Sequence, residues 1–160
     1  MNRAAIACMI AVTLAAPLAA KESLGVYSNW GAFRDDSPLR CYAIAKPSNA
    51  GNARPFASVS NWPRQNVRGQ VHFRLSRSVR DGEEATLTIG DRRFALPAND
   101  RNAWAQDARM DAAIVAALRS ASRMSVSARA ANGSRFTDRY DLTGAATAID
   151  AAVVGCATRG

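Results

Sequence analysis

Apolar and polar residues alternate along several short stretches of the chain, which is the period of half-buried β-strands. The clearest stretch is 70–77, where Val71, Phe73 and Leu75 point one way and the polar residues between them point the other. Similar patterns predict further strands at 40–46, 56–62, 85–89, 94–96, 124–128 and 136–142. We expect the strands between residues 70 and 96 to form an antiparallel meander with one wet face.

From residue 107 the apolar period becomes that of a helix, with Met110, Ile114 and Leu118 at helical spacing. Asp107 is placed to cap the N-terminus of this helix. Arg119 lies near its other end, where positive charge suits the helix dipole.

A second, alanine-rich helix is predicted after Gly144, with Ile149, Val153 and Cys156 on one side. Residues 21–38 are mixed and turn-rich, and 47–55 have the composition of an exposed loop. The sequence therefore predicts a mainly β chain of the α+β kind. We expect an antiparallel β-sandwich or open barrel with two short helices packed on it.

The first twenty residues have the three-part order of a secretory signal peptide. A positive charge at Arg3 precedes an apolar run from Ala4 to Leu14, and small residues follow up to Ala20. Pro17 and the small alanines argue against a membrane anchor, and a buried N-terminal helix is the other alternative. We expect cleavage at or next to Ala20, releasing a single periplasmic or secreted domain that covers residues 21–160.

The chain is strongly basic, with 21 Lys+Arg against 13 Asp+Glu and a formal net charge of +8 over 160 residues. Cleavage would remove only Arg3 and leave +7. Such a charge attracts anionic partners such as lipid headgroups, phosphorylated glycolipid, nucleic acid or acidic proteins. The alternative is that the preference for arginine over lysine only reflects GC-rich coding.

Three cysteines occur, and loss of the signal peptide would leave Cys41 and Cys156. An oxidising compartment favours a disulfide between them. A bridge over so long a loop stabilises a fold by about 4–5 kcal/mol in the chain-entropy model. Two free buried thiols are the alternative.

The usual catalytic groups are scarce, since His72 is the only histidine. With two cysteines expected to pair, no zinc or iron ligand set of the usual kind can be assembled, and we predict no metal and no cofactor. Arg74 and Arg77 beside His72 are cations, and no Gly-x-Ser-x-Gly motif is present, so a histidine-dependent hydrolase is disfavoured.

The carboxylates offer a weaker case for catalysis. Asp35–Asp36 and Glu83–Glu84 lie in or beside predicted turns, whereas glycosidases need two carboxylates that face one substrate. Asp138 shares a strand side with Phe136 and Tyr140, so we expect it to face inward with an arginine as its partner.

The best candidate surface is basic and surrounds the clearest strand, with Trp62 close in sequence. Arginine and aromatic residues on a sheet face bind anions or stack on bases. No RNA-binding or DNA-binding motif supports nucleic acid as the partner, and an ordinary solvated strand face is the alternative. The predicted binding face consists of Arg64, Arg68, His72, Arg74 and Arg77.

Several segments together form a recognisable series: Trp30, Arg40–Tyr42, Gln70–Arg77, Leu87–Gly90 with Phe94, Ala103–Ala105, Asp111–Arg119, Tyr140–Gly144 and Cys156. Their order resembles the invasion-associated locus B family of alphaproteobacterial exported proteins. The resemblance implies an extracytoplasmic, mainly β domain without established catalytic residues. Members often carry a cysteine shortly after the first tryptophan, and none lies between Gly31 and Asp36 here, which leaves Cys41 and Cys156 to pair.

Two hypotheses follow. The first is a non-enzymatic envelope protein that binds an anionic envelope component or a protein partner through the arginine-bearing sheet face. The second is a hydrolase of envelope polymers that uses carboxylates such as Asp138 or Glu84.

Overall fold

The computed structural model describes residues 21–157, which form two antiparallel sheets and two α-helices. The predicted signal peptide at 1–20 lies outside the described residues. The larger sheet has seven strands in the order β1-β2-β3-β4-β5-β9-β8, and the smaller has four in the order β11-β10-β6-β7. The strands of the larger sheet are β1 (Glu22–Tyr27), β2 (Trp30–Asp36), β3 (Leu39–Ala45), β4 (Phe56–Trp62), β5 (Val67–Arg74), β8 (Ala98–Asn99) and β9 (Asn102–Trp104). Those of the smaller sheet are β6 (Ala85–Ile89), β7 (Arg92–Leu96), β10 (Arg123–Arg129) and β11 (Arg135–Asp141).

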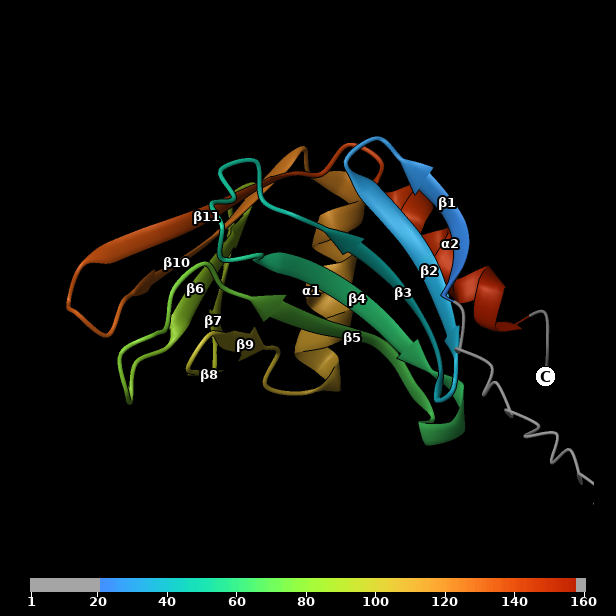
Figure 1. Ribbon diagram of the computed structural model, residues 1–160, viewed down its shortest axis with the longest axis horizontal. Helices are drawn as coiled ribbons and strands as arrows, with labels where there is room; N and C mark the ends of the chain where they lie inside the picture. Colours follow the sequence, from blue (N-terminus) through green and yellow to red (C-terminus); the bar gives the residue numbers. More distant parts are fainter. Residues whose placement is uncertain (1–20, 158–160) are drawn as a thin grey trace, which may run out of the picture.

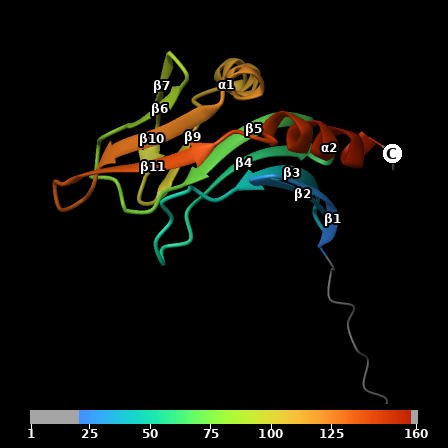
Figure 2. The ribbon, with the colours of Figure 1, turned by 90° about the horizontal axis from the view of Figure 1, so that it is seen from above.

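Both helices and the smaller sheet pack on one face of the seven-stranded sheet. Helix α1 (Ala108–Ser120), helix α2 (Ala145–Ala157) and the four-stranded sheet all lie on that side (Figures 1 and 2). The other side is turned to the viewer in Figure 1, and no helix or strand within residues 21–157 lies in front of it. The predicted mainly β sandwich with two helices is confirmed, and the sheets do not close into a barrel.

The hydrophobic core fills the space between these layers. Trp30, Phe73, Leu87, Ile114 and Ile149 contribute fully buried side chains from both sheets and both helices. Burial of large apolar side chains is the main driving force for bringing the layers together.

Two strands, β1 and β2, lie in the segment that the sequence predicts to be irregular. The helix-facing positions of β2 are Trp30, Ala32 and Arg34, and Arg34 is only 6% exposed. An arginine at an inward position breaks the apolar alternation, so the pattern does not identify the strand.

The predicted meander at residues 70–96 is wrong in one pairing. Strand β5 pairs with β4 and β9, whereas β6 pairs with β7 and β10 in the other sheet. The segment after β5 is held instead by residues 100 and 101, because the Leu75 N–H donates to the Arg101 carbonyl oxygen at 2.7 Å and the Val79 N–H to that of Asp100 at 2.7 Å. Alternation identifies a strand but does not name its partner.

Both predicted helices form. The Asp107 side chain accepts a hydrogen bond from the Met110 N–H, which confirms the predicted cap of α1. Gly144, immediately before α2, has φ +89°, and a Cβ there would collide with the carbonyl oxygen of Tyr27. Glycine is required at this crossing because the end of β1 passes directly against it.

The loop between β3 and β4 is exposed as predicted, but it is also anchored. The Asn49 side chain donates to the Thr137 carbonyl oxygen at 2.8 Å and accepts from the Arg139 N–H at 2.9 Å, both on β11. This amide satisfies part of the free edge of the smaller sheet. Neither helix in the described part of the chain combines the length and apolar character needed to cross a membrane.

Candidate binding face

The uncovered side of the seven-stranded sheet is rich in aromatic and cationic residues, and we call it the open face. Strand register places its members in rows: Phe33 lies opposite Tyr42, Ser58 opposite His72, and His72 in turn opposite Trp104. Directly opposed residues on antiparallel strands share one side of a sheet. We define the open face by Phe33, Arg40, Tyr42, Phe56, Trp62, His72, Arg74 and Trp104.

Arg40 is the centre of one half of the open face. Its guanidinium carbon lies 4.1 Å from the ring centroid of Tyr42 and 5.1 Å from that of Trp62. Its Nη2 donates to Asp35 Oδ2 at 2.7 Å. Lys21 lies 5.6 Å from the Tyr42 ring centroid, and a hydrogen bond with Tyr42 raises the pKa of this lysine. Both cations therefore lie over aromatic rings of the open face.

His72 and Arg74 form the other half. The His72 ring meets Phe56 edge-on at 5.6 Å between centroids, and its Nε2 lies 3.1 Å from Asn102 Oδ1. Arg74, opposite Phe56, is half-buried and has no ion pair among residues 21–157. Trp104 is 38% exposed at the edge of this half. The arrangement offers an uncommitted guanidinium beside aromatic surface.

Only two of the five residues that the sequence predicts as the binding face lie on the open face. His72 and Arg74 lie on the open face together with Trp62. Arg64 lies in a short 3₁₀ helix at Pro63–Gln65, and Arg77 follows β5 and donates to Ser134 Oγ at 2.8 Å. Arg68 departs from the alternation of β5.

A bulge explains the position of Arg68. Ser60 pairs with Gln70 but Trp62 pairs with Val67, so Arg68 and Gly69 together oppose Asn61. Gly69 has φ +68°, a conformation that suits glycine. The extra residue shifts Arg68 out of the row formed by His72 and Arg74. Arg68 instead lines a cavity on the helix side of the sheet.

Five members of the open face are absent from the predicted binding face: Phe33, Arg40, Tyr42, Phe56 and Trp104. Arg40 and Tyr42 lie in a strand that the pattern does predict, on the side opposite Cys41 and Ala43, and Tyr42 is 3% exposed because Arg40 and Phe33 pack against its ring. The alternation in β3 shows that Arg40 and Tyr42 share one side of that strand. No local pattern shows that β3 lies two strands away from β5 in the same sheet, so the sequence does not connect them with His72 and Arg74.

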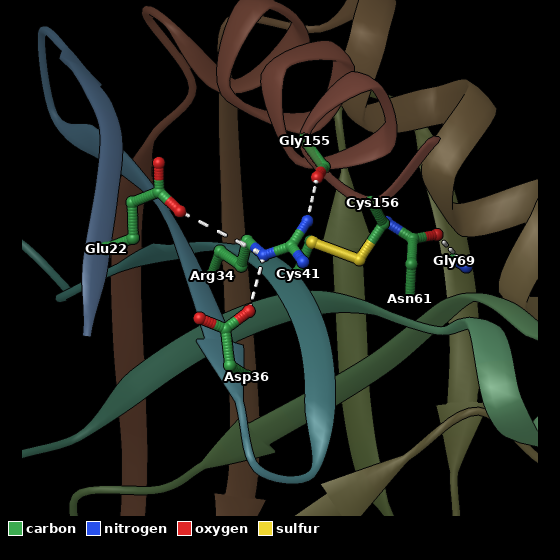
Figure 3. The surroundings of a disulfide bond; sticks show 8 residues. All are labelled: Glu22, Arg34, Asp36, Cys41, Asn61, Gly69, Gly155 and Cys156. Atoms are coloured by element: carbon green, nitrogen blue, oxygen red, sulfur yellow. Dashed lines mark hydrogen bonds and ion pairs between the residues drawn. A yellow bond between two sulfur atoms is a disulfide. The ribbon is translucent and has the colours of Figure 1, made fainter. Parts of the chain in front are cut away.

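The predicted disulfide is confirmed. Cys41 in β3 and Cys156 in the last turn of α2 are bonded, with Cα atoms 5.7 Å apart (Figure 3). Arg34 reinforces this junction, since its Nη1 donates to the Gly155 carbonyl oxygen at 2.6 Å and its Nε to Asp36 Oδ1 at 2.8 Å. A cation at the C-terminus of α2 also suits the helix dipole.

Asp138 faces inward as predicted, with 1% exposure, but its predicted arginine partner is wrong. Its Oδ2 accepts from the Ser76 backbone N–H at 2.8 Å, and no ion pair within residues 21–157 includes it. Arg101 instead donates to the carbonyl oxygens of Leu75 and Ser76. Burial and the nearby Asp138 raise the pKa of Tyr140, whose buried hydroxyl has no hydrogen-bond partner in the described chain.

The other acids considered for catalysis are dispersed. Asp35 pairs with Arg40, Asp36 pairs with Arg34, and Glu83 lies near Arg80 and Arg129. Glu84 is exposed just before β6. Neither Glu84 nor Asp138 lines the cavity between the helices and the seven-stranded sheet or the cavity beside β10 and β11. Among residues 21–157 no three His, Cys, Asp or Glu side chains gather as a metal site.

These features define a class of protein: a mainly antiparallel domain of two sheets. A disulfide links helix α2 to one face of the larger sheet, and the opposite face of that sheet is open. The sequence model of the Invasion associated locus B (IalB) protein family matches residues 33–153. The chain belongs to this family, which confirms the resemblance predicted from the sequence. The family is not a known enzyme family. Comparisons with curated proteins and with solved structures find no match.

Proposed function

We propose that this chain is a non-enzymatic, exported protein of the cell envelope that binds an anionic envelope component or protein through the open face. One observation carries the proposal: this aromatic and cationic sheet side is left uncovered by both helices and by the second sheet. Export is supported by the signal-like sequence at residues 1–20 and by the disulfide, which is typical of oxidising compartments.

The chemistry of the open face favours an anionic partner. Arg74 has no ion pair in the described chain, and Arg40 is shared between Asp35 and two rings. Arginine combines charge with flat stacking, and aromatic residues supply apolar contact area, which together are typical of binding hot spots. The net charge adds long-range attraction that salt weakens.

Affinity capture tests the proposal. The disulfide-bonded domain 21–160 is immobilised and exposed to envelope extract at low and at high salt, and the retained material is identified as protein, lipid or glycan. We expect retention at low salt that falls steeply as salt rises. Equal retention at both salt concentrations contradicts an electrostatic mode of binding.

A matched pair of charge variants locates the surface. R40Q/R74Q removes two cations from the open face, whereas R93Q/R135Q removes two exposed cations from the four-stranded sheet. Because both variants lose the same charge, a local contact predicts loss of retention only for R40Q/R74Q. Thermal unfolding confirms that each variant is folded. Equal weakening by the two variants would show that net charge, not the open face, drives retention.

A further inference from the structure

A cavity of about 570 Å³ lies on the helix side of the seven-stranded sheet, opposite the open face. It is bounded by α1, by α2 and by the end of the sheet where β4 turns into β5. Small-molecule sites in proteins usually measure about 300–1,000 Å³. The size of this partly open cavity therefore fits a small ligand.

The walls of the cavity are mainly apolar. Ala116 and Val115 contribute from α1, Ile149 and Val153 from α2, and Val59 from β4. Val153 is 48% exposed, so part of this apolar surface meets solvent. The small side chain on α1 at Ala116 leaves the space that a larger residue would fill.

One polar side chain in the wall is buried and incompletely bonded. Asn61 is 8% exposed, and its Oδ1 accepts from the Gly69 N–H at 3.0 Å. That donor fixes the orientation of the amide, so the Nδ2 group carries two hydrogen-bond donors, with no partner among residues 21–157. Figure 3 shows this nitrogen turned from Gly69 toward the Cys41–Cys156 disulfide. A buried donor of this kind calls for an acceptor.

The charged residues that line the cavity are all cations. Arg119 donates to Asp150 Oδ1 at 2.6 Å and is thereby paired. Arg68 is exposed and has no ion pair in the described chain. The β5 bulge sets Arg68 and Gly69 against Asn61 on the neighbouring strand, and Arg68 and Asn61 both line the apolar cavity.

We propose that this cavity binds a free long-chain fatty acid. The carboxylate accepts hydrogen bonds from Asn61 Nδ2 and pairs with Arg68, and the alkyl chain lies between α1 and α2 against Ile149 and Val153. A single anionic head and a single chain match one unpaired cation and one apolar cavity of this size. This site lies on the opposite side of the sheet from the open face and does not depend on the function proposed for that face.

The test uses the lipid-stripped, disulfide-bonded domain 21–160 and monomeric palmitate in a calorimetric titration. We expect saturable binding of one palmitate per chain. R68Q should weaken binding roughly tenfold, because a charge-assisted contact is lost. R64Q, a neighbouring exposed arginine that does not line the cavity, should leave binding unchanged.

A cavity-filling variant keeps the test independent of charge. Leucine at the exposed helical position of Ala116 is compatible with folding, and A116L should abolish binding while the melting temperature stays near that of the unmodified domain. In the unmodified domain, the side-chain amide resonance of Asn61 should shift on saturation with palmitate.

Three results would overturn the proposal. The first is absence of palmitate binding to the unmodified domain, and the second is binding that survives A116L with an unshifted Asn61 resonance. The third is binding to phosphatidylglycerol vesicles without binding to monomeric palmitate, which would indicate attraction to a membrane surface.

Discussion

At the scale of single residues, the buried polar groups show how this chain departs from a simple apolar pattern. Arg34 and Asp138 both occupy inward strand positions and are almost fully buried. Each has a backbone partner: Arg34 donates to the Gly155 carbonyl oxygen as well as to Asp36 Oδ1, and Asp138 accepts from the Ser76 N–H. Buried polar groups of this kind are tolerated only with such partners.

Asp138 is accordingly predicted to be structural. D138A would leave the Ser76 N–H without an acceptor, and we expect a loss of about 1–3 kcal/mol in the free energy of unfolding. D138N keeps a side-chain oxygen as acceptor and should lose less. Urea denaturation of the three proteins measures the difference, and an alanine variant as stable as the unmodified domain would contradict this role.

Asp111 gives a pH dependence with a definite sign. Burial raises the pKa of this carboxyl above its ordinary value of 3.8, although the Val71 N–H donates to its Oδ1 at 2.8 Å. The folded chain then holds the proton more tightly than the unfolded chain. Stability contributed by Asp111 therefore falls as pH rises from 3.8 to the raised pKa, and is constant above it.

D111N removes this titration and keeps an oxygen acceptor for Val71. Its stability relative to the unmodified domain should increase as pH rises through that interval and then level off. Thermal unfolding at a series of pH values between about 3 and 7 measures the trend. Parallel curves for the two proteins at all pH values would refute it.

At the scale of elements, local patterns predict most strands and both helices. Local patterns do not identify a strand in which an inward residue is charged, as in β2. They also do not show which strands pair with each other, as for β5 and β6. Pairing is decided by contacts between distant segments, such as the hydrogen bonds of residues 75 and 79 with 101 and 100. No local sequence signal contains that information.

The link between β3 and α2 is predicted to contribute strongly to stability. The disulfide joins residues 115 positions apart, and C41S/C156S should lower the free energy of unfolding by about 4–5 kcal/mol in the chain-entropy model. Denaturant titration measures the loss, and the unmodified domain under reducing conditions should behave like the variant. Equal stability of oxidised and reduced protein would contradict the prediction.

At the scale of the whole molecule, α1, α2 and the four-stranded sheet all lie on one side of the seven-stranded sheet. The sequence predicts the site in part, since His72 and Arg74 share the open face with Trp62. It misplaces Arg68, because the bulge at Gly69 is not visible in the alternation, and it omits Arg40, which reaches the site only through sheet order. A site built across several strands depends on topology more than on any one motif.

Binding at the open face is the central claim, and the tryptophans report on it directly. Trp62 and Trp104 lie on the open face, whereas Trp30 is fully buried on the other side of the sheet. Hydroxyl-radical footprinting of the domain, alone and with its captured envelope partner, measures the oxidation of each residue. We expect strong protection of Trp62 and Trp104, with oxidation of exposed residues on the four-stranded sheet unchanged. Bound protein in which both open-face tryptophans are oxidised as in the free domain would contradict it.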